Sequence, residues 1–519
     1  MPTTIQSAEK EHKATPEGDH LEAIPTMDRN GGSPIVSAKD DKRIRCRTDH
    51  RILVILCVIY ALQVLDKNII GYTAVLGLKQ DAHLVGNEYA TVTSMAPYAQ
   101  IVAQPLGSYL LVRFPLRFLV PLLMLLWATA LMCMAAATNY QALLATRFLL
   151  GYFEASCLPA FTLITIAWYR RVEQPFRIAI WYSTNGAGTI VGALLVWGLS
   201  HVQHSSLYLY QTVFLVAGAL TIIFIPYVWY TLNEPPTTAK FLTDSDRAKA
   251  IERLKANKTV SVTNKFDWCQ VIDAVTDPKT YLFAALSVLS NIMPYVNNTF
   301  GPILLSSIAG FKPQTTVLLN IPFGVMQTFA ILLTSWLTFR FQSKSLIFAL
   351  LYMPCVMGYA LLYALPHTRN NLGPLLFGFY SLAFSFGANP ILVAWIGANV
   401  AGTTKKSVMV SLYQATSAAG NIIAPNLFKA SDAPRYLHGL RNVLIILCVT
   451  LVLIGLTVIT LVYQTKQQVR KRIKAGKPAK LDDLSMRRKY DDQASGEHVG
   501  EGTAIDQTDR ENDEFIYVY

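Results

Sequence analysis

Charge is scarce in this sequence, and its distribution is uneven. Charged residues make up 15% of the 519 residues and hydrophobic residues 52%, whereas a soluble protein carries about a quarter charged residues. Asp, Glu, Lys and Arg are absent from residues 178–232, 281–309 and 372–402. A charge-free apolar run of about 20 residues is long enough to cross a ~30 Å hydrocarbon core as a helix. The composition therefore predicts an integral membrane protein.

The sequence also lacks the motifs of enzymes, metal sites and ATP-driven pumps. Its seven cysteines are scattered and form no CxxC pair, which favours neither a disulfide framework nor a metal site. No GxxxxGK[ST] loop occurs, so ATP-driven transport has no support. The net charge of +12 lies mainly beside the expected helix ends, which favours a role in membrane topology over nucleic-acid binding. We expect no enzymatic activity, no cofactor and no nucleic-acid partner.

Apolar segments between polar breaks predict twelve membrane-spanning helices in two groups of six. The fold class expected is an all-α membrane protein with two pseudo-symmetric six-helix bundles, the layout of the major facilitator fold. The spans are 51–72, 89–112, 116–137, 141–168, 176–200, 208–231, 279–303, 314–339, 345–365, 372–398, 405–428 and 440–465. The expected domains are a disordered N-terminal tail (1–48), a first bundle (49–232), a central loop (233–278), a second bundle (279–466) and a disordered C-terminal tail (467–519). Within the central loop, an amphipathic helix is expected at about Asp244–Lys255, capped by Thr243.

The basic residues of the loops predict how the chain is oriented. The loops after the second, fourth, eighth and tenth spans hold nine Lys or Arg: Arg113, Arg117, Arg170, Arg171, Arg177, Arg340, Lys344, Lys405 and Lys406. The loops of the other side hold five: Lys79, Lys312, Arg369, Lys429 and Arg435. Because basic loops stay in the cytoplasm, both termini and the central loop are expected there. We expect a multi-pass protein of the plasma membrane that works as a monomer.

Only four residues inside the twelve spans, away from their ends, are charged: Asp66, Lys67, Arg147 and Glu154. A charge near the centre of a bilayer costs at least ~2.5–3.5 kcal/mol, so such residues usually face a water-filled cavity and a partner. Lys67 and Arg147 are suited to bind a carboxylate, and Asp66 and Glu154 to bind and release protons. The alternative is that the four charges form ion pairs that only hold helices together.

Uncharged polar residues within the spans supply further candidates for substrate binding. Tyr98 in the second span, together with Asn389 and Trp395 in the tenth, is a candidate for the wall of a polar cavity. Hydrogen bonds between helices are the alternative role for such residues.

Several segments resemble the fungal allantoate permease family, in the anion:cation symporter branch of the major facilitator superfamily. The resemblance extends from about Asp49 to the C-terminus. The fourth span is similar over Arg147-Phe148-Leu149-Leu150-Gly151-Tyr152-Phe153-Glu154-Ala155 and Pro159, and the first over Leu65-Asp66-Lys67-Asn68-Ile69-Ile70-Gly71-Tyr72. Further similarity lies in Asn399-Val400-Ala401-Gly402-Thr403-Thr404-Lys405-Lys406-Ser407 and, near the end of the chain, in Asp509-Arg510-Glu511-Asn512 with Phe515 and Tyr517.

The resemblance implies secondary active transport: proton-coupled symport of a small organic anion by alternating access. Allantoate, nicotinate, pantothenate, biotin or a similar carboxylate is the implied substrate, and protons are the implied second partner. The resemblance assigns anion binding to Lys67 and Arg147 and proton coupling to Asp66 and Glu154. An antiporter that exports a metabolite or drug, and a nutrient sensor that binds without transporting, remain alternatives.

Overall fold

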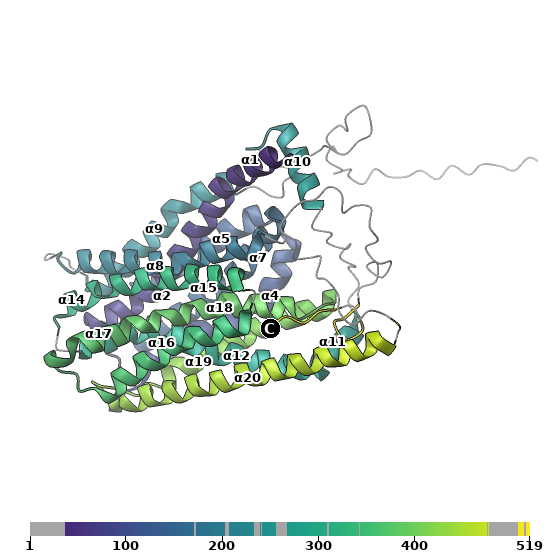
Figure 1. Cartoon of the computed structure of the whole chain (residues 1–519). Helices are drawn as coiled ribbons and strands as arrows, with labels where there is room; N and C mark the ends of the chain where they lie inside the picture. The colour runs from purple at the N-terminus through teal and green to yellow at the C-terminus, as the bar shows by residue number, and fades with distance from the viewer. Residues whose placement is uncertain are drawn as a thin grey trace, which may run out of the picture.

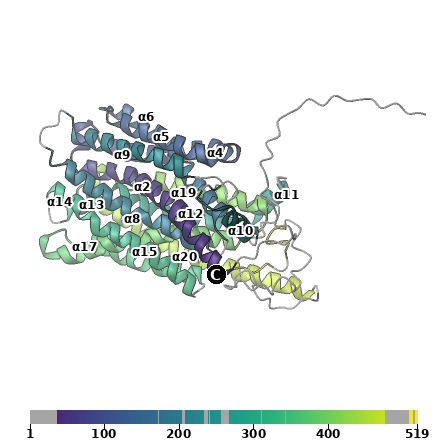
Figure 2. The same cartoon turned by 90° about the horizontal axis from the view of Figure 1, so that it is seen from above.

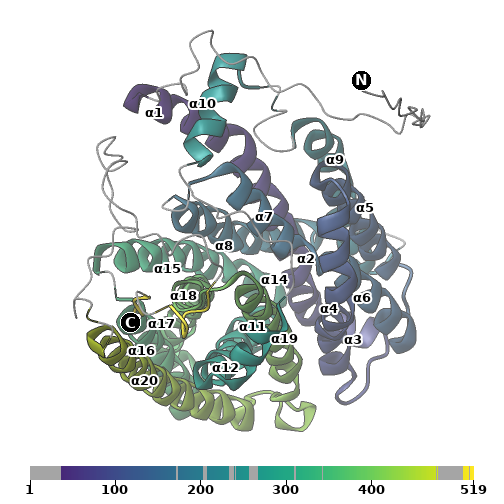
Figure 3. The same cartoon turned by 90° about the vertical axis from the view of Figure 1, so that its right-hand side faces the viewer.

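A computed structural model describes residues 37–170, 173–202, 207–232, 239, 241–255, 267–308, 311–341, 343–474, 476, 507–512 and 515–519. Every regular secondary-structure element among these residues is a helix. Viewed end-on in Figure 3, the helices of the first half of the chain form one group and those of the second half form another beside it. The predicted fold class, an all-α membrane protein with two six-helix bundles, is confirmed.

Each bundle contains six long helical segments, some of which are interrupted. The first bundle consists of α2 (Val54–Val75), α4 (Glu88–Arg113), α5 (Leu116–Met134), α6 with α7 (Tyr140–Glu154 and Cys157–Trp168), α8 (Gln174–Leu199) and α9 (Leu209–Thr231). The second consists of α12 with α13 (Pro278–Thr299 and Gly301–Ser307), α14 with α15 (Pro313–Leu318 and Asn320–Phe341), α16 (Lys344–Ala364), α17 with α18 (Leu372–Ser381 and Ala388–Ala398), α19 (Thr403–Asn426) and α20 (Leu437–Lys474). A 3₁₀ segment, η4 (Leu382–Gly387), joins α17 to α18. The interruptions divide four of the twelve predicted spans into shorter helices.

Hydropathy distinguishes the helices within the described part of the chain. Nine helical segments there are long and apolar enough to cross a membrane. The other three long helices are α4, α12 and α19, which carry many Ser, Thr, Asn and Gln residues. In the packed structure α4 lies against α19, and α12 lies against α2, so all three contact the other bundle. Their polar composition therefore fits a position between the bundles better than contact with lipid.

The two ends of the bundles differ in what they carry. Helices α1 (Ala38–Thr48), α10 (Asp244–Lys255) and α11 (Trp268–Thr276) lie at one end with the C-terminus, and we call this end the terminal face (Figures 1 and 2). The other end, where α13, α14 and the start of α17 lie, is called the opposite face (Figures 1 and 2). In Figure 1, α1 with the start of α2 and the far end of α20 spread apart toward the terminal face.

Close backbone contacts hold the bundles together from the opposite face to the middle. Near the opposite face, a Cβ on Gly71 would lie 2.7 Å from the carbonyl oxygen of Asn298. Near the middle, Gly186 of α8 lies directly against Gly324 of α15, and the Thr328 hydroxyl donates a hydrogen bond to the Ser183 carbonyl (3.1 Å). Small residues allow helix backbones to approach in this way.

The helix predicted in the central loop is confirmed. Helix α10 has the predicted bounds, Asp244–Lys255, and the backbone N–H of Asp246 donates to the Thr243 hydroxyl at its start (3.3 Å). The Asp246 carboxylate accepts hydrogen bonds from Arg43 and Arg47 of α1. Disorder was predicted for residues 1–48, but residues 38–48 form helix α1. Residues 1–36 of that tail and residues 256–266 of the central loop lie outside the described residues.

The end of the chain departs from the prediction of a disordered tail. Helix α20 continues to Lys474, and residues 507–512 and 515–519, here called the C-terminal segment, lie against the second bundle. Asp509 is fully buried among Lys279, Lys405 and Asp277. Tyr517 is 4% exposed, and its hydroxyl donates to the Asp509 carboxylate (3.0 Å). The remainder of the tail, residues 477–506, lies outside the described residues.

Candidate functional site

Two of the four charged residues within the spans form an ion pair inside the first bundle. Lys67 of α2 and Glu154 of α6 form an ion pair in which Nζ and Oε1 are 2.8 Å apart. The Glu154 side chain is 2% exposed and the Lys67 side chain 29% exposed, so the lysine reaches open space and the glutamate does not. Glu154 is the last residue of α6, immediately before the break that separates α6 from α7. Its second oxygen, Oε2, is buried without a hydrogen-bond partner among the described residues.

Asp66 is adjacent to Lys67 in sequence but has a different partner. Its Oδ2 accepts a hydrogen bond from the indole N–H of Trp127 in α5 (3.1 Å), and the residue is 2% exposed. Its other oxygen, Oδ1, has no hydrogen-bond partner among the described residues. Sequence reasoning missed Trp127, although a Trp inside a span carries an N–H donor that normally finds an acceptor when buried.

Arg147 is the most unusual of the four charges. It is 4% exposed, it forms no ion pair or hydrogen bond with any described residue, and its Nε is buried without a partner. Tyr89 of α4, Tyr295 of α12 and Glu154 lie close enough to interact with it electrostatically. Tyr295 belongs to the second bundle, and its hydroxyl donates to the Thr93 carbonyl of the first (2.6 Å). The guanidinium of Arg147 therefore lies near the contact between the two bundles.

The other predicted site residues have different environments. Asn389 is 8% exposed, and its side-chain amide donates to the Tyr182 hydroxyl of the first bundle (3.2 Å) and to Asn291 (3.0 Å). Tyr98 is 47% exposed on α4. Trp395 is fully buried, and its indole N–H donates to the Val518 carbonyl of the C-terminal segment (3.0 Å). Asn389 therefore lies at the contact between the bundles. The indole N–H of Trp395 is already used by a hydrogen bond to the C-terminal segment.

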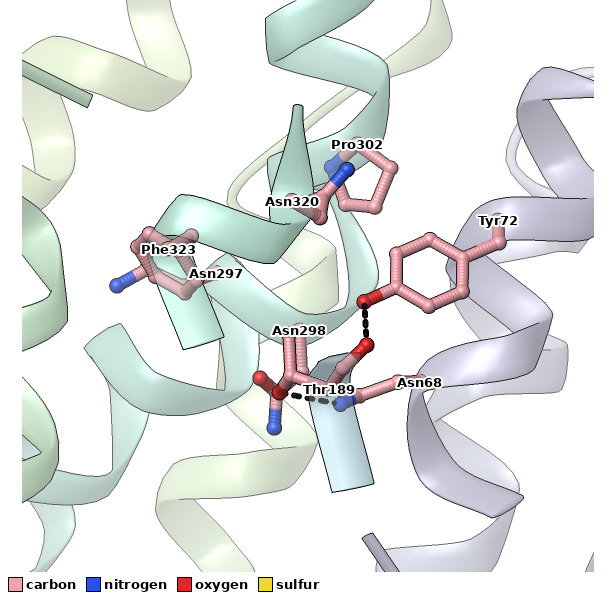
Figure 4. A pocket seen from close by; sticks show the side chains of 8 residues that line it. All are labelled: Asn68, Tyr72, Thr189, Asn297, Asn298, Pro302, Asn320 and Phe323. Carbon is pink, nitrogen blue, oxygen red and sulfur yellow. Dashed lines mark hydrogen bonds between the residues drawn. The ribbon is translucent and has the colours of Figure 1, made fainter. Parts of the chain in front are cut away.

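A small polar pocket lies between the bundles (Figure 4). Its empty volume is about 170 Å³, and it is lined by Asn68, Tyr72, Thr189, Asn297, Asn298, Pro302, Asn320 and Phe323. Figure 4 shows the Asn68 amide directed at the Thr189 hydroxyl (2.9 Å) and the Tyr72 hydroxyl directed at the Thr189 carbonyl (3.2 Å). Thr189 in turn donates to Gln327 of the second bundle (2.7 Å). Neutral hydrogen bonds therefore join the bundles at this level.

Metal chemistry has little basis in this arrangement. Within the described part of the chain, no group of three or more His, Cys, Asp or Glu residues is placed to hold a metal ion. The four charges instead combine two buried acids with two cations, and one of these cations, Arg147, has no ion-pair partner among the described residues. Such a set can exchange protons and attract an anion.

A sequence profile described as the Major Facilitator Superfamily matches residues 56–425. The chain belongs to the major facilitator superfamily. Within the described residues, twelve long helical segments in two bundles, with polar helices at their contact, agree with this membership. The protein is a transporter of the superfamily. It is a multi-pass membrane protein and not an enzyme.

Two named yeast proteins are similar to this transporter over most of its length. The thiamine pathway transporter THI73 of Saccharomyces cerevisiae is 30% identical over 479 residues, which cover 91% of this chain and 86% of that protein. The allantoate permease of the same species is 27% identical over 471 residues, covering 87% and 85%. An uncharacterized transporter of Schizosaccharomyces pombe is 30% identical over 484 residues, covering 92% and 86%. The resemblance to the fungal allantoate permease family is confirmed.

A solved structure shares the fold of this transporter at low sequence identity. It is a bacterial homolog of the human lysosomal transporter Spinster, in an inward-facing and unoccupied conformation. The match has a TM-score of 0.60 and 14% identity, and it covers 82% of this chain and 98% of that one. This similarity supports the fold alone.

Proposed function

We propose that the protein is a proton-coupled symporter of a small organic anion that works by alternating access. The observation that carries the proposal is Arg147, a 4% exposed guanidinium without an ion-pair partner among the described residues. A buried charge without a partner is costly, and a guanidinium binds a carboxylate through two parallel hydrogen bonds. A carboxylate substrate would therefore complete the site. Allantoate, nicotinate, pantothenate, biotin and similar acids are the candidates, and the relative named allantoate permease supports this class.

Glu154 is the proposed coupling residue because it holds the second cation. In the structure its carboxylate is paired with the ammonium group of Lys67. A proton bound to Glu154 would neutralise the carboxylate and weaken this pair, so Lys67 could turn its charge toward the substrate. After the substrate is released, the Lys67 ammonium group would return to Glu154 and favour loss of the proton from its carboxyl group. Proton and anion binding would in this way favour each other, as symport requires. Asp66 is the second proposed proton site.

The orientation of the protein in the membrane is part of the proposal. The distribution of Lys and Arg in the loops favours a cytoplasmic terminal face, and α20 ends there with Lys471, Arg472 and Lys474. The bundles contact each other from the opposite face to the middle. The structure would then represent a conformation closed to the outside. We place the protein in the plasma membrane as a monomer.

Uptake of radiolabelled carboxylates into proteoliposomes tests the function. The wild type is expected to accumulate a substrate when the outside is acidic and to show little uptake without a pH gradient. Arg147→Gln should lose anion binding, and Arg147→Lys should recover part of it because the charge is kept. Arg369→Gln, in the loop before α17, serves as the matched control. Wild-type substrate affinity in Arg147→Gln would refute the assignment.

A further inference from the structure

The C-terminal segment is bonded to the end of α18 and to the turn that joins α18 to α19. We call this turn, residues 399–402, the corner. The side chain of Asn399 pairs with the backbone of Val518 in both directions: its Nδ2 donates to the carbonyl (2.9 Å), and its Oδ1 accepts from the N–H (2.9 Å). The same carbonyl accepts from the indole N–H of Trp395 (3.0 Å). Figure 3 shows the C-terminal segment, in yellow, beside α18.

The C-terminal segment is also anchored to other helices of the second bundle. Its Arg510 donates a hydrogen bond to the Asp273 carboxylate of α11 (2.9 Å). The Tyr519 hydroxyl donates to Thr465 of α20 (2.6 Å), and the Lys344 N–H of α16 donates to the Tyr519 carbonyl (2.8 Å). The segment therefore joins the end of α18 to three helices that are not its neighbours in the chain.

Helix α18 lies between two points where the backbone departs from an α-helix. At its start the 3₁₀ segment η4 joins it to α17, and 3₁₀ turns within a helix often mark a hinge. At its end the corner closes with Gly402, whose φ of 91° is accessible to glycine. Beyond the corner, α19 has an anchor of its own, because the Thr404 N–H donates to Gln270 of α11 (3.0 Å). The end of α18 thus depends on side-chain contacts, and the C-terminal segment supplies them.

Helices α18 and α19 both contact the first bundle, α18 through α8 and α19 through α4. Hydrogen bonds between the bundles occur near the opposite-face end of α19. There the Ser94 hydroxyl of α4 donates to the Ile422 carbonyl (3.3 Å), and the Ala430 N–H donates to Asn87 (3.1 Å). At the terminal face, the corner is the end of these two helices. If the two faces open alternately, the corner belongs to the part of the second bundle that moves when the terminal face closes.

We propose that the C-terminal segment is a strap that makes α18 and the corner move together with the rest of the second bundle. This inference rests on the proposed function, because it assumes that the two faces open alternately. Alternating access is largely a rigid-body rocking of one bundle against the other, so a helix end that lags behind slows the cycle. The strap sets the rate of the cycle and leaves substrate affinity unchanged, because Arg147 and Glu154 lie in the first bundle.

Hydrogen–deuterium exchange of the purified full-length protein tests whether the strap holds the corner. Val518→Pro removes the N–H that Asn399 accepts, whereas Val518→Ala keeps it, so the two variants form a matched pair. In Val518→Pro, amides of the last turn of α18 and of the corner should exchange about fivefold faster, as expected for the loss of one hydrogen bond. The Thr404 amide, held by Gln270, should keep its rate, and Val518→Ala should match the wild type.

Transport measures the consequence for the cycle. Exchange of radiolabelled substrate across proteoliposomes is followed with whichever of allantoate, nicotinate, pantothenate and biotin the wild type accumulates. Val518→Pro should lower the maximal rate about fivefold and leave the half-saturating concentration unchanged. Val518→Ala should change neither.

Asn399→Leu tests the same pair from the other side. It removes both hydrogen bonds to Val518 and should also lower the maximal rate. If the two residues act as a unit, the double variant Asn399→Leu/Val518→Pro is no slower than Asn399→Leu alone. Unrelated losses of stability would add instead. Each single variant is compared with the wild type by itself, so poor folding of one leaves the other as a test.

The outcomes separate this inference from the proposed function. Unchanged deuterium exchange at the corner in Val518→Pro, or an unchanged maximal rate, would overturn the strap while the wild type still transports its anion. Equal slowing by Val518→Ala, or a change confined to the half-saturating concentration, would overturn it as well. A wild type that transports none of the four acids would contradict the proposed function and this inference with it.

Discussion

The ammonium group of Lys405, at the start of α19, lies 3.0 Å from the Oδ1 of Asp509 in the C-terminal segment, and both side chains are fully buried. Lys279, at the start of α12, is buried against the same carboxylate and lies 3.2 Å from Asp277. Two fully buried lysines are therefore balanced by two fully buried aspartates, one of which comes from the end of the chain. The C-terminal segment thereby joins the terminal-face ends of α12 and α19.

Removal of the Asp509 charge should destabilise the second bundle. Asp509→Asn leaves the two lysines with one fully buried carboxylate, and loss of one partner of a buried ion pair costs about 3–5 kcal/mol. Thermal unfolding of the purified protein measures the loss, and Glu511→Gln, at an exposed neighbour, is the control. The double variant Asp509→Asn/Lys279→Met restores neutrality and should be more stable than Asp509→Asn. A double variant that is less stable would contradict this account.

Acid should weaken the same cluster. Burial alone would raise the pKa of Asp277, but the charges of Lys279 and Lys405 outweigh it and hold the pKa below its ordinary value of 3.8. A lowered pKa in the folded state gives stability that is complete above the unfolded pKa and is lost as the pH falls through the folded value. Asp277→Asn should therefore unfold at a lower temperature than the wild type near about pH 6, and the difference should shrink toward about pH 3. A difference in unfolding temperature between Asp277→Asn and the wild type that stays constant with pH would contradict the lowered pKa of Asp277.

Neutralising Glu154 should separate anion transport from the proton gradient. Glu154→Gln cannot release a proton, and it leaves Lys67 without its ion-pair partner. Substrate exchange across the membrane should continue, whereas accumulation driven by an acidic outside should disappear. Glu88→Gln is the matched control, because Glu88 lies at the start of α4, where its carboxylate accepts a hydrogen bond from the Val85 N–H (2.8 Å). Unchanged pH dependence in Glu154→Gln would exclude it as the coupling residue.

The hydrogen bond between Trp127 and Asp66 should contribute to stability. Trp127→Phe keeps most of the buried ring and removes the donor, so we expect a loss of ~1–3 kcal/mol from the unpaired carboxylate. In the Asp66→Asn background the same change should cost less, because the acceptor is then neutral. A double-mutant cycle from thermal unfolding measures this difference. Equal losses in both backgrounds would show that Trp127 acts through packing alone.

The contact between α8 and α15 should not tolerate a side chain at Gly186. A Cβ there would overlap the Gly324 carbonyl oxygen and the Thr328 hydroxyl of the second bundle. Gly186→Ala should therefore force the bundles apart locally and cost ~1–3 kcal/mol, with a matching loss of transport. Gly198→Ala on the same helix is the control, since nothing lies within 4 Å of its added Cβ. Equal transport and stability of the two variants would contradict the close approach.

The sequence by itself determined the helices and which charged residues lie within them. Runs without charge, interrupted by polar breaks, are a local property of the chain, so the twelve spans and the two bundles could be predicted. The same holds for α10, whose cap and bounds follow from neighbouring residues. Asp66, Lys67, Arg147 and Glu154 were evident because a charge within an apolar span is conspicuous wherever the helices finally pack.

Only the tertiary structure decided which of these residues meet. Asp66 and Lys67 are adjacent, but successive side chains on a helix point about 100° apart, so one bonds to Trp127 and the other to Glu154. Trp395 donates a hydrogen bond to Val518, and Asp509 is buried between Lys279 and Lys405. Both contacts join segments that are far apart in the sequence. Such contacts leave no periodic pattern in the chain. For that reason composition predicted a disordered tail where the structure places a packed C-terminal segment.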